Sequence, residues 1–179
     1  VLLPLQVHVL LARAQAWSAS SAELRKDAQT LLAAVNEHRQ ALGYARADAW
    51  INLARVGLLL DDVALAAPAV APLTADVGLN LGKDLLLASR VAQIEGELAR
   101  LQGDLPRSRE RLQQRMQVFD RPGDKQLLPA WVAALDLAWT LVLMNDPAAE
   151  AAVQAAAARR PPGVPPSHAL DHVQAFLQA

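Results

Sequence analysis

The chain has no cysteine, few aromatic residues and no excess of charge of either sign. Its 179 residues include four Trp, two Phe and one Tyr, and 17 basic residues balance 18 acidic ones. The lack of cysteine excludes disulfides, thiol nucleophiles and zinc sites built on thiolates. The balance of charge excludes a global field that would attract nucleic acid or an anionic membrane. Any partner must therefore be recognised locally.

Long apolar runs and strand-forming residues are also scarce. No apolar stretch approaches the roughly 18 residues that a membrane helix needs, so we expect a soluble, cytoplasmic chain. The apolar segment 3–17 lacks a basic leader and contains Gln6 and His8, so we interpret it as an amphipathic helix rather than a signal peptide. Alanine, the strongest helix former, supplies 37 residues. The composition predicts an all-α fold in a single domain, 1–179.

Short polar turns recur at a constant spacing along the chain. The segments LLDDVA, LQGDLP and LMNDPA each contain an aspartate, Asp62, Asp104 and Asp146, at intervals of 42 (104 minus 62, and 146 minus 104). One more such interval, here called the repeat spacing, leads back from Asp62 to Ser20. Asp and Ser are preferred helix N-caps, because their side-chain oxygens accept a hydrogen bond from a free backbone N–H of the first turn. The spacing predicts four helical hairpins, each with a capping residue at its bend.

The positions of the turns define the expected helices. The predicted hairpins pair 3–17 with 21–42, 46–60 with 63–75, 83–102 with 105–120, and 126–144 with 147–159. We expect a last helix at 168–178 that covers the apolar face of the fourth hairpin. Pro68 and Pro72 fall inside a predicted helix, where each removes a backbone hydrogen bond, so we expect this helix to be kinked or broken.

Three sets of positions follow the same spacing and are predicted to pack the helices together. Small residues stand eight positions before each cap: Ala12, Ala54, Gly96 and Ala138. The next set stands one residue earlier: Leu11, Leu53 and Leu137, with Glu95 interrupting it. The last set stands three residues before the caps: Trp17, Leu59, Leu101 and Leu143.

This pattern resembles the tetratricopeptide repeat, a two-helix unit with the signature W-x2-L-G-x2-Y followed by A-x3-F and P. In the second hairpin Trp50, Leu53, Ala54 and Gly57 take the first four places. The repeat spacing exceeds the usual length of about 34 residues and is similar to that of the long-helix arrays attached to bacterial kinases and transcription regulators. The resemblance implies a right-handed superhelix of about four antiparallel hairpins with a C-terminal capping helix.

The same resemblance implies a function, the binding of a peptide or protein surface in a concave groove lined by the first helix of each hairpin. The implied groove residues are Gln6, Val9, Arg13, Asp48, Ile51, Arg55, Arg90, Gln93, Glu97, Arg100, Val132, Leu135 and Trp139. Several Arg and a Trp would suit an acidic segment with an apolar anchor. The alternative is that these Arg form ordinary salt bridges with acids such as Asp48 and Glu97. We expect no enzymatic activity and no cofactor.

A second hypothesis concerns nucleic acid. Arg107, Arg111 and Arg115 follow one another at intervals of four, which predicts a basic stripe that could contact phosphates. No aromatic residue interleaves the stripe, as a base-stacking surface requires. The alternative interpretation is a solvated outer helix face.

A third hypothesis is a metal-dependent enzyme. His168 and His172 are four residues apart and could share a helix face as metal ligands, although the sequence offers no third ligand. The segment GLNLGKD at 78–84 resembles a phosphate-binding loop, but its glycines are four residues apart, and Asp84 replaces the hydroxyl residue that would hold a metal.

The excess of 14 Arg over 3 Lys and the abundant Ala favour an origin in a larger bacterial regulatory protein.

Overall fold

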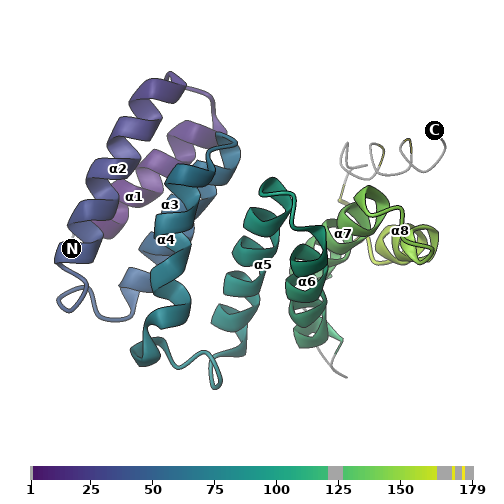
Figure 1. Ribbon diagram of the computed structural model, residues 1–179. Coiled ribbons are helices and arrows are strands. Elements are labelled where there is room, and N and C mark those ends of the chain that lie inside the picture. The colour runs from purple at the N-terminus through teal and green to yellow at the C-terminus, as the bar shows by residue number, and fades with distance from the viewer. Residues whose placement is uncertain (1, 121–126, 165–170, 172–174, 176–179) are drawn as a thin grey trace. The chain divides into compact units, whose positions relative to one another are not determined.

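The computed structural model describes residues 2–120, 127–164, 171 and 175 (Figure 1). The described residues form α-helices joined by turns, with one short 3-10 segment and no strand, which confirms the predicted all-α fold. The chain divides into two compact units, Val1–Ile94 and Glu95–Ala179. The prediction of a single domain stays a prediction.

The helices follow the predicted hairpins closely. They are α1 (Leu2–Gln15), α2 (Ser21–Glu37), α3 (Ala45–Leu59), α4 (Val63–Ala75), η1 (Val77–Leu79), α5 (Leu85–Leu101), α6 (Leu105–Phe119), α7 (Leu127–Leu143) and α8 (Ala149–Ala158). The boundary between the units falls inside α5. The predicted helix 168–178 lies outside the described residues apart from 171 and 175.

The helix α2 is shorter than predicted. It ends at Glu37, whereas the sequence predicted an end at residue 42. Its last buried residue is Val35, so further helical turns would bury no apolar surface against the unit. The chain leaves the helix through a series of turns that includes Gly43, whose φ of +55° is left-handed and suits glycine.

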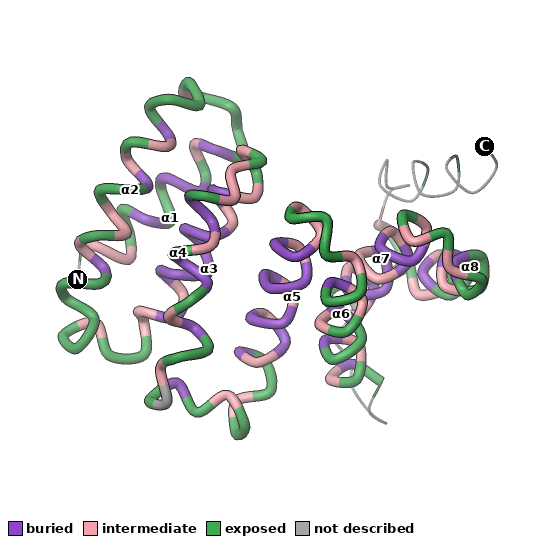
Figure 2. Tube along the Cα trace, viewed as in Figure 1, coloured by how far each residue is buried: buried purple, intermediate pink, exposed green. Residues whose placement is uncertain are grey.

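The first unit is built around α3, which packs against α1, α2 and α4. Most of α3 is drawn as buried in Figure 2, and its Trp50, Ile51 and Leu53 are at most 1% exposed. The indole N–H of Trp50 donates a 2.9 Å hydrogen bond to the side chain of Asn36 on α2. Gly57 allows α3 and α4 to approach closely, since a Cβ atom at this position would lie 2.6 Å from the backbone nitrogen of Ala66.

The second unit is built around α7, which packs against α6 and α8. Its apolar core consists of Trp131, Ala134, Leu135, Ala138, Val153 and Ala156. A buried pair of hydroxyls, Ser108 on α6 and Thr140 on α7, lies 3.2 Å apart and satisfies both groups where the two helices meet. Gly96 on α5 brings the backbone close to Leu112 on α6.

The predicted caps are confirmed at three bends and displaced at the fourth. Ser20 forms a capping box with Glu23, because its hydroxyl accepts from the backbone of Glu23 and the Glu23 carboxylate accepts from the backbone of Ser20. Asp62 and Asp104 each accept a hydrogen bond from the backbone N–H three residues later. Asp146 accepts from the N–H of Ala148 instead, because a turn separates it from the first residue of α8.

Three of these bends share one backbone geometry at successive repeat spacings. The residue before each aspartate has a left-handed backbone: Asp61 (φ +50°), Gly103 (φ +79°) and Asn145 (φ +52°). The N–H of each aspartate then donates to a carbonyl five residues earlier: Asp62 to Gly57, Asp104 to Ala99 and Asp146 to Leu141. This is the Schellman pattern of a helix C-terminus. The first bend has the same pattern two residues earlier relative to its cap, with Trp17 left-handed and the N–H of Ser18 donating to the carbonyl of Arg13.

The helix predicted to be kinked or broken at Pro68 and Pro72 is not broken, and the kink stays a prediction. The helix α4 runs without interruption from Val63 to Ala75 with both prolines inside it. Two prolines four residues apart lie on the same helix face, and their missing N–H groups would have bonded the carbonyls of Ala64 and Pro68. Ala64 and Pro68 are both exposed, so water can satisfy these carbonyls, while Leu65, Ala69 and Leu73 hold the helix on the core.

The predicted packing positions are confirmed in part. Ala54, Gly96 and Ala138 are buried, as are Leu11 and Leu53, but Ala12 is exposed. The set three residues before the caps is wrong for Trp17, Leu59 and Leu143, which are 67%, 38% and 38% exposed. These residues sit at or just beyond the last helical turn, where the chain leaves the core.

Candidate interaction surface

The part of the implied groove that lies on the first hairpin contains an apolar hollow. The hollow has a volume of about 400 Å³ and lies over α1 and α2. Its lining includes three predicted groove residues, Gln6, Val9 and Arg13. Leu2, Leu5 and Val9 also line it, although they are 71%, 60% and 51% exposed. Three large apolar side chains on one helix face, next to a hollow, are typical of an interaction surface.

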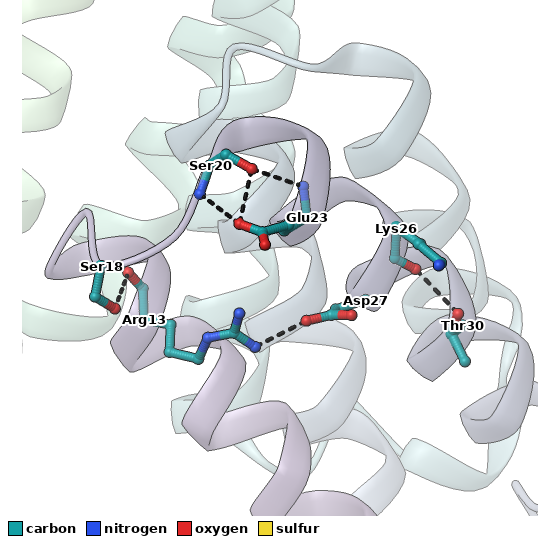
Figure 3. A network of polar contacts seen from close by, with 7 residues as sticks. All are labelled: Arg13, Ser18, Ser20, Glu23, Lys26, Asp27 and Thr30. Carbon is teal, nitrogen blue, oxygen red and sulfur yellow. Dashed lines mark hydrogen bonds and ion pairs between the residues drawn. The ribbon is translucent and has the colours of Figure 1, made fainter.

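One end of this hollow is closed by an ion pair. The guanidinium of Arg13 on α1 donates a 2.8 Å hydrogen bond to the carboxylate of Asp27 on α2, as Figure 3 shows. Figure 3 also shows the capping box of Ser20 and Glu23 that begins α2, one helical turn before Asp27. Arg13 is therefore engaged within the hairpin, as the salt-bridge alternative predicts.

The α3 and α5 part of the implied groove is also internally paired. Arg90 on α5 donates a 2.5 Å hydrogen bond to Asp48 on α3, which lies one repeat spacing away in sequence. The implication that Ile51 lines a groove is wrong, because this side chain is fully buried. Arg55 and Gln93 each interact with another group as well.

The second unit places four charged groups together where α5, α6 and α7 meet. Arg115 on α6 is 4% exposed and is ion-paired with Asp136 on α7. Burial and the nearby negative charge of Glu97 together raise the pKa of Asp136 to about 6, although Arg115 and Arg100 oppose the shift. Glu97 and Arg100 were implied groove residues. Arg115 is buried, and the other three members of the cluster are partly buried.

Trp139, the aromatic residue expected to anchor a ligand, is partly buried against the core of the second unit. It already interacts with another group. Of the other two α7 residues in the implied groove, Leu135 belongs to that core and Val132 is partly buried. The apolar side chains of α7 thus serve mainly to hold α6 and α8.

A buried carboxylate lies between α5 and α6. Glu95 is 8% exposed and its carboxylate is 3.5 Å from the guanidinium of Arg111. Burial raises the pKa of Glu95, and the charge of Arg111 acts in the opposite direction. Glu95 occupies the place in the spacing that leucine holds at Leu53 and Leu137. An ion pair therefore replaces an apolar contact at this position.

The predicted arginine stripe on α6 is not formed. Arg107 is exposed, Arg111 is partly buried beside Glu95, and Arg115 is buried beside Asp136. An interval of four residues exceeds one 3.6-residue turn by about 40°, so this row winds by about 80° around the helix over eight residues. Arg115 consequently faces α7. Both the continuous phosphate-binding stripe and the fully solvated face are wrong.

The remaining chemical candidates receive no support from the described residues. Within them, no three His, Asp or Glu side chains are close enough together to hold a metal ion. His168 and His172 lie outside the described residues. The segment 78–84 follows no strand, and Asp84 instead caps α5 by accepting a 2.9 Å hydrogen bond from the N–H of Leu87. In the same part of the chain, no helix is long and apolar enough to cross a membrane.

The most exposed apolar residues of the hollow, Leu2 and Leu5, were not among the implied groove residues. The positions that the resemblance implies on this helix begin only at Gln6, after its first turn. A signal was nevertheless present, because Leu2, Leu5 and Val9 follow the i, i+3, i+7 spacing of one helix face.

No family model, curated protein sequence or solved structure matches the chain.

Proposed function

We propose that the chain is a non-enzymatic protein-interaction module that binds a peptide or protein surface at the hollow over α1 and α2. The observation that carries this proposal is the exposure of Leu2, Leu5 and Val9 beside a hollow of about 400 Å³. Burying aliphatic side chains of this size against a partner contributes on the order of 1 to 3 kcal/mol each.

The charges around the hollow set its selectivity. At the hollow, Arg13 is held by Asp27, whereas Arg90, a groove residue outside its lining, is held by Asp48. An acidic segment would have to compete with an internal carboxylate for either guanidinium. These side chains are about 40% exposed, and ion pairs of this kind contribute little stability, so a better-placed carboxylate can displace the internal one. We therefore propose an apolar anchor as the main determinant, with acidic flanks as a secondary one.

The proposal includes the superhelical, tetratricopeptide-like stacking that the sequence resemblance implies and a place in a larger, cytoplasmic bacterial regulatory protein. Both stay predictions. The hairpin bends that share one hydrogen-bond pattern at successive repeat spacings support the first of them.

A displayed library of random peptides can test the proposed function. The immobilised chain should enrich peptides with clustered apolar residues, and Val9→Glu should abolish their binding because a carboxylate would then enter the apolar hollow. Leu128→Glu is the matched control, since Leu128 on α7 is 53% exposed and Val9 is 51% exposed. Peptides that bind equally to the wild type and to Val9→Glu would place the binding site elsewhere and reject the proposal.

A further inference from the structure

A polar cavity of the first unit lies where the turn after α2 meets the start of α3 and the end of α4. Its volume of about 490 Å³ falls within the range of small-molecule sites. Its charged lining consists of Arg39, Arg46 and Asp76. The cavity shares no lining residue with the hollow over α1 and α2, so a ligand bound here would be independent of the proposed function.

One of the two arginines, Arg46, is held in place by its neighbours. Its Nε donates a 2.6 Å hydrogen bond to the carboxylate of Asp76, and its Nη1 donates to the carbonyl of Gly43. Its Nη2 lies against Gly78, where a Cβ atom would be only 2.9 Å away, so glycine leaves room for the guanidinium. A guanidinium carries five N–H groups, and these two hydrogen bonds leave others for an acceptor in the cavity. Because Arg46 is already ordered, binding an acceptor costs little further entropy.

The other arginine, Arg39, carries a charge that the protein leaves available. It is exposed in the turn after α2 and makes no ion pair with another described residue. The hydrogen bond from Arg46 is the main cause that lowers the pKa of Asp76, and the charge of Arg39 adds to this effect, which places Arg39 near that carboxylate. Asp76 is already engaged, since one oxygen accepts from Arg46 and the other accepts a 2.9 Å hydrogen bond from the N–H of Gly78.

The balance of charge around the cavity favours an anion. Two guanidinium groups and one carboxylate give the lining a net charge of +1 (two minus one). The helix α4 ends in the lining at Ala75, and the partial charge of a helix C-terminus, roughly −0.5, reduces this balance without reversing it. A guanidinium matches the geometry of a carboxylate or a phosphate, with which it forms paired hydrogen bonds.

The rest of the lining is suited to the body of a ligand rather than to its charge. Pro72, Ala75 and Trp50 contribute the apolar part of the lining, and Gln40 adds a neutral amide that can donate or accept. Small-molecule sites commonly combine apolar walls with a few fixed polar groups. A bare inorganic ion would leave this apolar part of the cavity unused.

We propose that this cavity binds a small organic oxyanion, a carboxylate or phosphate carried on an apolar body. Arg46 and Arg39 hold the oxyanion, and the apolar body lies against Pro72 and Ala75. Asp76 acts as a positioning residue, because it orients the guanidinium of Arg46 instead of contacting the ligand.

Calorimetric titrations of the chain with benzoate, phenyl phosphate, inorganic phosphate and the neutral analogue benzamide test the proposal. Benzoate or phenyl phosphate should bind with a dissociation constant of about 1 mM or lower, and added salt should weaken this binding. Benzamide and inorganic phosphate should bind about tenfold more weakly, since one lacks the charge and the other the apolar body. The tighter of the two phenyl compounds identifies the preferred oxyanion.

A pair of charge-removing variants locates the site. Arg39→Gln should weaken the binding of the anion about tenfold, because a hydrogen bond to a charged group is lost. Lys26→Gln is the matched control, since it removes one positive charge from an exposed position on α2 outside the cavity and should have no effect. Both residues are exposed, so both variants should keep the helical circular dichroism of the wild type. In ¹H–¹⁵N NMR spectra, the ligand should shift the amide signals of Gly43 and Gly78 but not that of Gly57.

The proposal would be overturned by a wild type that binds neither phenyl compound saturably. Benzamide or inorganic phosphate binding as tightly as the phenyl anions would also overturn it, because the charge or the apolar wall would then play no part. Unchanged affinity in Arg39→Gln would place the anion elsewhere on the chain.

Discussion

The guanidinium of Arg109 lies 2.8 Å from the carboxylate of Asp146, the aspartate that begins the bend before α8. The first unit contains the same relation, since Arg25 on α2 is ion-paired with Asp62, the cap of α4. Both partners are shifted by 84 (109 minus 25, and 146 minus 62), which is two repeat spacings. In each unit, therefore, an arginine on the second helix of one hairpin is ion-paired with the aspartate at the bend of the next hairpin.

The tie to Arg25 should make Asp62 more important than an ordinary cap. Asp62→Ala removes both the cap and the ion pair, whereas Asp104→Ala removes a cap that has no ion pair among the described residues. We expect losses of about 1 kcal/mol for the cap alone and up to about 1 kcal/mol more for the ion pair. Urea unfolding of both variants measures the difference.

A double-mutant cycle isolates the contribution of Arg25. Arg25→Ala should destabilise the wild type but have almost no effect in the Asp62→Ala background. The hydrogen bond from Arg25 also holds the pKa of Asp62 below its usual value, so Arg25→Ala should raise that pKa. Equal effects of Arg25→Ala in both backgrounds would show that the pair is not coupled.

Gly57 should be the least replaceable glycine of the first unit. A Cβ atom there would meet the backbone of Ala66 at 2.6 to 2.8 Å, and backbone cannot rotate away as a side chain can. We expect Gly57→Ala to lower the free energy of unfolding by about 1 to 3 kcal/mol through overpacking, in spite of alanine's higher helix propensity. Thermal unfolding provides the measurement.

Two other glycines serve as controls for Gly57. Gly96→Ala should be less destabilising, because its close neighbour is the side chain of Leu112, and Gly82→Ala should be nearly neutral, because nothing lies within 4 Å. If Gly57→Ala were as stable as Gly82→Ala, α3 and α4 would not be as close as described.

Removing one partner of the Glu95–Arg111 ion pair should strongly destabilise the protein, whereas replacing both partners with apolar residues should be tolerated. Arg111→Val leaves a carboxylate that is 8% exposed without its partner, and we expect a loss of about 3 kcal/mol or more. Adding Glu95→Leu should recover most of this loss, since Leu and Val occupy the corresponding places at Leu137 and Val153 of the fourth hairpin. Urea unfolding of the single and double variants tests this. A double variant no more stable than Arg111→Val would show that the site cannot accept an apolar pair.

Helices and caps could be predicted from the sequence because they are local. A cap needs only an Asp or Ser at the right place, and the repeat spacing identified Ser20, Asp62 and Asp104 as caps. It also predicted Asp146 as a cap, but a turn separates Asp146 from α8. The side-chain partners depend on how helices face one another. Arg115 pairs with Asp136 across two helices, and no regularity of either helix alone indicates it.

One tertiary contact, that of Glu95 with a basic residue, could be inferred from the sequence. Glu95 interrupts a row of leucines at a buried position, and a buried carboxylate requires a cationic partner. Sequence alone could therefore have predicted a basic residue facing Glu95, although it could not have distinguished Arg111 from its neighbours Arg107 and Arg115.

The raised pKa of Asp136 predicts that stability falls as pH rises from about 4 to 6. Asp136 titrates near pH 6 in the folded protein and at about pH 3.9 when unfolded. Between these values the folded state holds a proton that the unfolded state has lost, so deprotonation favours unfolding. We expect the free energy of unfolding to fall by on the order of 3 kcal/mol across this window. Asp136→Asn should remove the dependence in urea titrations at a series of pH values.

Asp84→Asn provides the opposite control, because the hydrogen bond from Tyr44 lowers the pKa of Asp84 and its stabilisation is lost only as pH falls below about 4. Persistence of the fall in Asp136→Asn would assign it to another carboxylate, with Glu95 the first to test, since burial also raises its pKa.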